Sequence, residues 1–407
     1  MSHSRSSEDR FSLPGGYLLP QEEMLEIGKK QKKLSIGVPK EDHKTESRVP
    51  LTPEAVEILS GNGHDIFIEK GAGNAANYSD NDYSEKGGII VDRKEEIFHT
   101  DIVLKIAPPT ISEANLLKSQ QILISSLHLT HQSKELIQNL IHKKITSIST
   151  ESIKDENNNF PVTRSMSAIA GNTSVLIAAE YLSNTRGGKG VMLGGLTGIT
   201  PTEVVILGAG TAAEYAVRAA KGLGAFVKVF DQSVHRLIEL QNNTGFRLHT
   251  SVFHPNVIKK ALMSADVLIG AIHLADTGAR YYITEDMVKV MKKGSVIIDL
   301  SIDQGGCVET SECKTQTDPV FTRHGVIHYC VPNIPSRVAR TASIALSNVF
   351  LPLLLEISDS GGLNAKLKED RGLRNGVYLY NGILTKDYIG KLYNLPSKDL
   401  DLLMAAF

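Results

Sequence analysis

Cysteine is scarce in this sequence, since Cys307, Cys313 and Cys330 are the only three among 407 residues. An odd number, without the paired spacing of metal ligands, argues against a disulfide framework and against a metal site. Free thiols are typical of a reducing compartment. We therefore expect a cytoplasmic location and no bound metal.

Net charge and long apolar runs are also lacking. The 44 Lys and Arg nearly balance 45 Asp and Glu, whereas proteins that bind nucleic acids or anionic membranes need clustered basic residues. The longest apolar run, near residues 349–357, ends in charge and is shorter than the roughly 20 residues that cross a bilayer. We therefore expect no nucleic acid and no membrane as a partner, and a small molecule instead.

Short apolar segments alternate with helical patterns from Leu34 onward. Between them, Thr52 and Pro53 are typical of a helix start, because threonine caps a helix and proline fits its first turn. Alternating strands and helices favour parallel sheets joined by right-handed crossovers. The ten segments that suggest strands are residues 34–38, 65–69, 102–106, 122–127, 145–149, 203–207, 226–230, 267–272, 295–299 and 326–330.

The chain length predicts two α/β domains, because 407 residues exceed the roughly 250 to 300 that one core supports. Residues 1–33 are polar and charged, which is typical of an N-terminal extension. Residues 34–163 form the first predicted domain, and residues 164–339 the second. Because residues 340–407 are too few for a domain, we expect them to return to the first, which makes that domain discontinuous.

A glycine-rich turn follows the predicted strand 203–207. The first glycine makes a tight turn, the second lets the backbone approach a pyrophosphate, and the small Ala213 allows close packing of helix on strand. Free N–H groups at the helix start then meet the phosphate oxygens. The residues of this candidate cofactor site are Gly208, Ala209, Gly210, Thr211 and Ala212.

Asp231 ends the next predicted strand, 23 residues beyond Gly208. A carboxylate at this point accepts the ribose hydroxyls of NAD and repels the 2′-phosphate of NADP. A turn without a ligand is the weaker interpretation, because strand, turn, helix and acidic residue all agree. The predicted fold class is therefore α/β, with two Rossmann-like domains, parallel sheets, and an NAD site in the cleft between them.

Other polar residues lie at or just past the ends of predicted strands. Histidine suits proton transfer near neutral pH, a lysine among apolar residues can contact a carboxylate, and arginine can bind one bidentately. Each also has an ordinary structural interpretation, such as a snorkelling lysine or a solvated arginine. The candidates for chemistry are Arg48, Lys105, His128, Asp303 and Asn333.

Taken together, the motifs resemble the family of alanine dehydrogenase and the transhydrogenase alpha subunit, from about Ile36 to the C-terminus. The segment Asp303-Gln304-Gly305-Gly306 is of the dehydrogenase type, because the transhydrogenase relatives usually have Asn before the paired glycines. The motifs that carry the resemblance are residues 37–41, 46–53, 104–105, 127–129, 165–171, 187–195, 302–307 and 330–335.

This resemblance implies reversible oxidative deamination of L-alanine to pyruvate and ammonium, with hydride transfer to NAD through an imine, in a homohexamer. It implies that Arg48 and Lys105 hold the substrate carboxylate and that His128 is the acid and base. Asp303 would then activate water beside the cofactor. Asn333 would lie near substrate and nicotinamide, Asp231 on the adenosine ribose, and Ser167 near the cofactor.

Two departures from the family pattern bear on substrate preference. Ala107 and Pro108 stand where the family commonly has a charged residue and Glu, and Ala168 stands beside Ser167 where Glu is frequent. A dehydrogenase for another small amino acid is therefore a second hypothesis. A third is an NAD-binding subunit that docks on a transhydrogenase complex. A fourth is an NAD sensor without activity, which the complete proton-transfer set disfavours.

Overall fold

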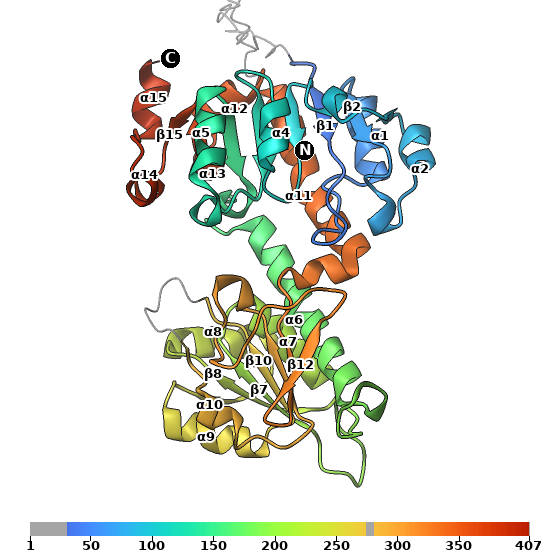
Figure 1. Ribbon diagram of the computed structural model, residues 1–407, viewed down its shortest axis with the longest axis vertical. Coiled ribbons are helices and arrows are strands. Elements are labelled where there is room, and N and C mark those ends of the chain that lie inside the picture. The colour runs from blue at the N-terminus through green and yellow to red at the C-terminus, as the bar shows by residue number, and fades with distance from the viewer. Residues whose placement is uncertain (1–30, 274–280, 407) are drawn as a thin grey trace, which may run out of the picture.

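The structure is a computed structural model and describes residues 31–273 and 281–406. It has two lobes, each built on one mainly parallel sheet covered by helices (Figure 1). Two long helices, α6 (Pro161–Leu182) and α11 (Ala339–Asp359), lie where the lobes meet. The mainly parallel α/β architecture predicted from the alternating pattern is confirmed.

The first sheet has eight strands in the order β15, β14, β6, β5, β4, β1, β2, β3. The strands from β6 to β3 are parallel, while β14 runs antiparallel to β6 and to β15. Two strands from the end of the chain thus complete a sheet that its beginning forms. The strands are β1 (Ser35–Val38), β2 (Asp65–Glu69), β3 (Ile89–Val91), β4 (Ile102–Leu104), β5 (Ile122–Ser125), β6 (Thr146–Ser149), β14 (Val377–Tyr380) and β15 (Ile383–Leu384).

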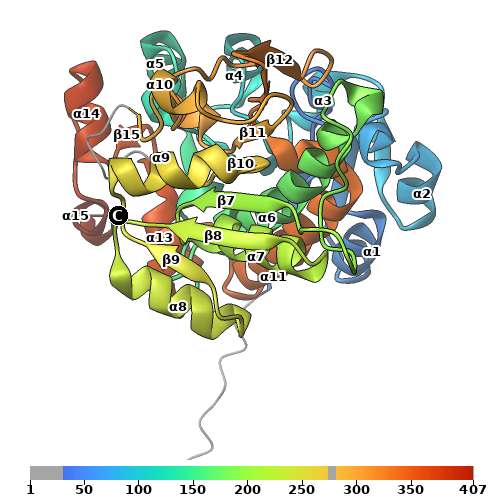
Figure 2. The same ribbon diagram turned by 90° about the horizontal axis from the view of Figure 1, so that it is seen from below.

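The second sheet has seven strands in the order β12, β13, β11, β10, β7, β8, β9 (Figure 2). All are parallel except β12, which pairs antiparallel with β13. The strands are β7 (Glu203–Leu207), β8 (Phe226–Phe230), β9 (His249–Ser251), β10 (Val267–Gly270), β11 (Val296–Asp299), β12 (Val320–Arg323) and β13 (Val326–Tyr329).

The parallel parts of both sheets share one strand order. In each, the chain proceeds outward over three strands and then crosses back to the other side of the first, between β1 and β4 in one lobe and between β7 and β10 in the other. Ligands of such sheets bind outside the carboxyl ends of the strands, where the loops diverge at this reversal. The topology therefore places a binding crevice at the carboxyl edge of each sheet.

Shorter helices cover the faces of both sheets. The helix α1 begins as predicted, since Thr52 accepts a hydrogen bond from the Ala55 N–H at 3.4 Å and Pro53 is in the first turn. The helices besides α6 and α11 are α1 (Pro53–Gly61), α2 (Asp80–Glu85), α3 (Lys94–Ile97), α4 (Ile111–Leu116), α5 (Lys134–His142), α7 (Thr211–Gly222), α8 (Val234–Thr244), α9 (Pro255–Ser264), α10 (Glu285–Val288), α12 (Leu363–Glu369), α13 (Arg371–Gly376), α14 (Asp387–Tyr393) and α15 (Leu400–Ala406).

The helix α6 belongs to both cores. Near its start Met166 packs against the core of the first lobe, and further along Val175 and Ala178 are buried in the core of the second. Gly171 lies between them, and a Cβ atom at this position would be 2.0 Å from the Ala212 carbonyl oxygen. Only glycine therefore lets α6 approach the start of α7 this closely.

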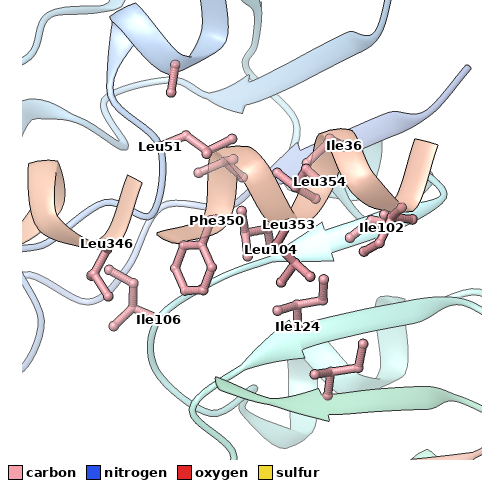
Figure 3. Close-up of a cluster of buried hydrophobic side chains, with 14 of the residues drawn as sticks. Ile36, Leu51, Ile102, Leu104, Ile106, Ile124, Leu346, Phe350, Leu353 and Leu354 are labelled. Carbon is pink, nitrogen blue, oxygen red and sulfur yellow. The ribbon is translucent and has the colours of Figure 1, made fainter. Parts of the chain in front are cut away.

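The helix α11 is the centre of the first core. Its side chains Phe350, Leu353 and Leu354 face strand residues such as Leu104 and Ile124 (Figure 3). With the preceding turn, the segment Ile334–Asp359 is long and apolar enough to cross a membrane by length and composition alone, contrary to the expectation that no segment reaches that length. Its burial against the sheet identifies it as a core helix, which also needs apolar residues.

Candidate active site

A cavity of about 1070 Å³ lies between the lobes. The first lobe contributes the loops that follow β1, β4, β5 and β6, and the second contributes those that follow β7, β8, β10, β11 and β13. The carboxyl edges of the two sheets therefore face one cavity. Its size matches clefts that enclose small-molecule ligands and cofactors.

The glycine turn forms one wall of this cavity. Gly208 has φ of +100°, and a Cβ atom there would be 2.3 Å from the Ala271 carbonyl oxygen. At Gly210, no atom of residues 31–273 and 281–406 lies within 4 Å of the corresponding position. No side chain at Gly210 caps the helix α7 that follows. Its first N–H groups therefore remain available, as the binding of a pyrophosphate requires.

Asp231 lies at the end of β8 and connects the glycine turn to α8. One carboxylate oxygen accepts the Ala209 N–H and the other the Ser233 N–H, both at 2.8 Å. The residue is only 4% exposed, yet it lines the cavity. Each carboxylate oxygen has a second lone pair, so Asp231 can still accept hydrogen bonds from a ribose.

Arg48 lines the other end of the cavity and is held by Glu46. Its Nε and Nη2 atoms donate to the two Glu46 oxygens at 2.7 and 2.5 Å, and Asn333 from the second lobe donates to Glu46 at 2.9 Å. Burial alone would raise the pKa of Glu46, but the hydrogen bonds from Arg48 hold that pKa below its usual value. A charged carboxylate therefore occupies the bidentate face of the Arg48 guanidinium.

Lys105 lies outside the cavity wall. Its side chain is 2% exposed, and its ammonium donates to Glu113 of α4 at 2.8 Å and lies 3.5 Å from a Glu41 oxygen. Although burial opposes it, Lys105 lowers the pKa of Glu113 to about 2. The following residues Ala107 and Pro108 line the cavity instead. The predicted contact of Lys105 with the substrate carboxylate stays a prediction.

His128 begins the turn after β5 with φ of +41°, a left-handed backbone conformation, and its side chain lines the cavity. Its backbone N–H donates to Glu151 at 2.9 Å, and its Nδ1 atom lies 3.6 Å from the same oxygen. Glu151 is not among the residues predicted from the sequence, although it lies two residues past the strand predicted at 145–149, a position similar to that of His128.

Asp303 faces His128 from the second lobe. It lies in the short 3₁₀ turn Ile302–Gln304 after β11 and lines the cavity. Burial raises the pKa of Asp303, and the nearby His128 opposes this rise. The two candidate proton-transfer groups therefore interact across the cavity, one from each sheet.

The structure thus brings most of the candidate residues to one cavity. Ser167 on α6 belongs to this wall, whereas Ala168 beside it does not. Because Ala107 shares the cavity with His128, the departure from the family pattern at Ala107 and Pro108 lies in the site itself. The candidates that line the cavity are Arg48, His128, Ser167, Gly208, Ala209, Gly210, Thr211, Ala212, Asp231, Asp303 and Asn333.

Comparison with known families accounts for both lobes. The model of the alanine dehydrogenase/PNT N-terminal domain matches residues 37–170, and that of the C-terminal domain matches residues 174–387. The chain belongs to the alanine dehydrogenase/PNT family. The family and its Rossmann-type fold imply a nicotinamide dinucleotide cofactor.

Relatives in this family cover nearly the whole chain. Alanine dehydrogenase of Methanococcus maripaludis is 40% identical over 89% of this chain and 97% of its own length. That of Staphylococcus saprophyticus is 38% identical over 90% and 98%. A solved L-alanine dehydrogenase is 36% identical, with a TM-score of 0.83 over 88% of this chain and 99% of that one. A transhydrogenase from Sinorhizobium meliloti has a TM-score of 0.74 at 21% identity over 87% and 99%, which shows the shared fold alone.

Proposed function

We propose that this chain is an NAD-dependent L-alanine dehydrogenase that catalyses the reversible oxidative deamination of L-alanine to pyruvate and ammonium. The observation that carries the proposal is the single cavity in which His128 and Asp303 face each other beside the glycine turn. Alanine dehydrogenases that are 38% and 40% identical over about nine tenths of the chain support the same reaction. The three cysteines are free, which fits the proposed cytoplasmic location.

The residues of the chain bind and orient the substrate. Arg48, through the N–H groups that Glu46 does not take, holds the carboxylate together with Lys105 and Asn333. The α-hydrogen then points toward the glycine-turn side of the cavity, which is a proximity effect. When it is bound there, the nicotinamide supplies the acceptor for the hydride. The residues that fit the dinucleotide are Ser167, the N–H groups of Gly210, Thr211 and Ala212, and the carboxylate of Asp231.

His128 and Asp303 handle protons and water. His128 accepts a proton from the ammonium group of alanine, and hydride loss from the α-carbon then gives the imine. Asp303 accepts a hydrogen bond from the water that adds to this imine, after which ammonium leaves and pyruvate remains. Glu151 keeps the His128 ring in place through its contact with the backbone N–H and Nδ1 of that residue.

The direct test is an assay of the purified full-length protein with NAD and L-alanine, in which absorbance reports the formation of NADH. We expect turnover with L-alanine that exceeds turnover with L-serine, glycine and L-2-aminobutyrate. Tight NAD binding without turnover of any of the four would contradict the proposed activity. Light scattering of the same sample checks the proposed homohexamer.

The cofactor choice gives a separate prediction. We expect Asp231→Asn to weaken NADH binding about tenfold, the value of one hydrogen bond to a charged group, and to reduce the preference over NADPH. The isosteric amide keeps the shape of the carboxylate but removes the charge that repels a 2′-phosphate. Titration of both cofactors by fluorescence measures the two dissociation constants, and an unchanged ratio would rule out this role for Asp231.

A further inference from the structure

The His128 turn, residues 128–132, has a backbone conformation that needs support. His128 is in the left-handed region with φ of +41° and directly precedes the short 3₁₀ turn Leu129–His131. A non-glycine residue in this region is strained, and such strain persists only where the surrounding structure holds the backbone in place. Because the His128 side chain lines the cavity, the groups that hold the turn also set the position of the imidazole.

A tyrosine from the C-terminal part of the chain contacts this turn. The Tyr393 hydroxyl donates to the Gln132 carbonyl at 2.6 Å and lies 2.9 Å from the Leu129 carbonyl, so that one proton is shared between the two. The Gln132 N–H in turn donates to the Leu129 carbonyl at 3.3 Å. Since Glu151 accepts the His128 N–H, the turn is held at its first residue and at its last.

The helix α14, which Tyr393 ends, is fixed to the first lobe. Ile389 is fully buried in the hydrophobic cluster that also contains Leu129, and the Tyr393 ring packs against the same cluster. In Figure 1 this helix lies at the side of the first lobe. The Tyr393 hydroxyl therefore has a defined place beside the His128 turn.

The same helix also supports the partner of His128. At the start of α14, the Tyr388 hydroxyl donates to the Tyr378 hydroxyl at 3.1 Å, and the latter lies 2.9 Å from the Ser152 hydroxyl. Ser152 directly follows Glu151, which accepts the His128 N–H. Two tyrosines of α14 thus connect the helix to both members of the pair formed by His128 and Glu151.

We propose that Tyr393 is a positioning residue for His128, because its hydroxyl holds the His128 turn in the conformation that presents the imidazole to the cavity. The inference rests on the proposed function, since it concerns the general acid and base of that reaction. Tyr393 does not line the cavity, so it acts through the backbone of the turn. The family models end at residue 387, and this support therefore comes from beyond the matched domains.

Steady-state kinetics of Tyr393→Phe test the proposal. The variant keeps the ring that packs against the cluster and removes only the hydroxyl. We expect kcat for L-alanine to fall about 3- to 10-fold, the equivalent of one hydrogen bond. The KM for L-alanine and the dissociation constant of NADH should stay near the wild-type values, because the cofactor and the substrate carboxylate do not contact the turn. An unchanged kcat would overturn the inference.

The matched control is Tyr380→Phe, which also removes one tyrosine hydroxyl. That hydroxyl donates to Asn364 at 3.3 Å, a contact that does not involve the turn, so kcat should stay at the wild-type value. Tyr393→Leu separates the hydroxyl from the ring, because it removes both. If Tyr393 only packed against the cluster, Tyr393→Phe would keep the wild-type kcat and only Tyr393→Leu would lose it, which would refute the positioning role.

A spectroscopic readout separates this inference from the proposed reaction. The protein is labelled with [13Cε1]histidine, and the His128 resonance is identified by its absence in His128→Ala. In Tyr393→Phe we expect this resonance to shift or broaden, while those of histidines outside the turn stay in place. Such a change supports the inference even if the wild type does not oxidise alanine, an outcome that would contradict the proposed function alone. An unchanged His128 resonance overturns the inference at any kcat and leaves the proposed function standing wherever alanine is oxidised.

Discussion

Replacing His128 with alanine is expected to lower kcat for L-alanine by about 100- to 10 000-fold, the usual contribution of a general acid and base. The side chain is 56% exposed and lines the cavity. The fold and the glycine turn should therefore remain intact. The dissociation constant of NADH, measured by fluorescence titration, should stay within about twofold of wild type, while turnover is followed by absorbance.

His131 provides the matched control, because it lies in the same turn, is exposed, and does not line the cavity. His131→Ala should keep both turnover and NADH binding. If His128→Ala lost NADH binding together with turnover, the histidine would have a structural role. If it kept turnover, proton transfer would have to be assigned to another group.

Replacing Lys105 with methionine is expected to destabilise the protein by about 3 to 5 kcal/mol, the cost of removing one partner from a buried ion pair. Glu113 and Glu41 would remain buried without the ammonium that faces them at 2.8 and 3.5 Å. Urea unfolding at a fixed protein concentration measures the loss. Lys105→Met/Glu113→Gln should restore part of the stability, because it removes one of the two buried carboxylates that lose the Lys105 ammonium.

The same pair predicts the direction of a pH dependence. The pKa of Glu113 is about 2 in the folded chain, below its usual value of 4.5, because Lys105 and Lys94 outweigh the effect of burial. Its stabilising contribution is therefore complete above about pH 4.5 and is lost as the pH falls toward 2. In Lys105→Met this dependence on acid should be weaker. If Lys105→Met had wild-type stability and a raised KM for alanine, Lys105 would instead be assigned to substrate binding.

Much of the fold follows from local patterns in the sequence. Strands buried on both faces, such as β10 and β11, read as continuous apolar runs, and each of the ten predicted strands has a counterpart in a sheet. The strands that escaped prediction are β3, β9, β12, β14 and β15. Four of these lie at sheet edges or next to them and are short or half-exposed, so side-chain periodicity cannot indicate them.

Less of the candidate site than of the fold could be predicted from the sequence. The position past a strand end correctly indicated that His128 and Asp303 face a crevice, because strand ends of a parallel sheet share one edge. The same reasoning did not indicate Glu113 on the next helix, which pairs with the Lys105 ammonium at 2.8 Å. Which partner a charge takes depends on tertiary distances, and neither spacing nor composition contains them.

Gly171 has a consequence for the geometry of the whole site. At this residue α6 contacts the Ala212 carbonyl of the glycine turn. Because a helix rises about 1.5 Å per residue, Ser167 lies about 6 Å along α6 from this contact. Met166 on the same helix contacts Arg48 of the first lobe. The absence of a side chain at Gly171 thus fixes the distance between the glycine turn and the first lobe. A larger residue at this position would misalign the hydride donor and acceptor without contacting either.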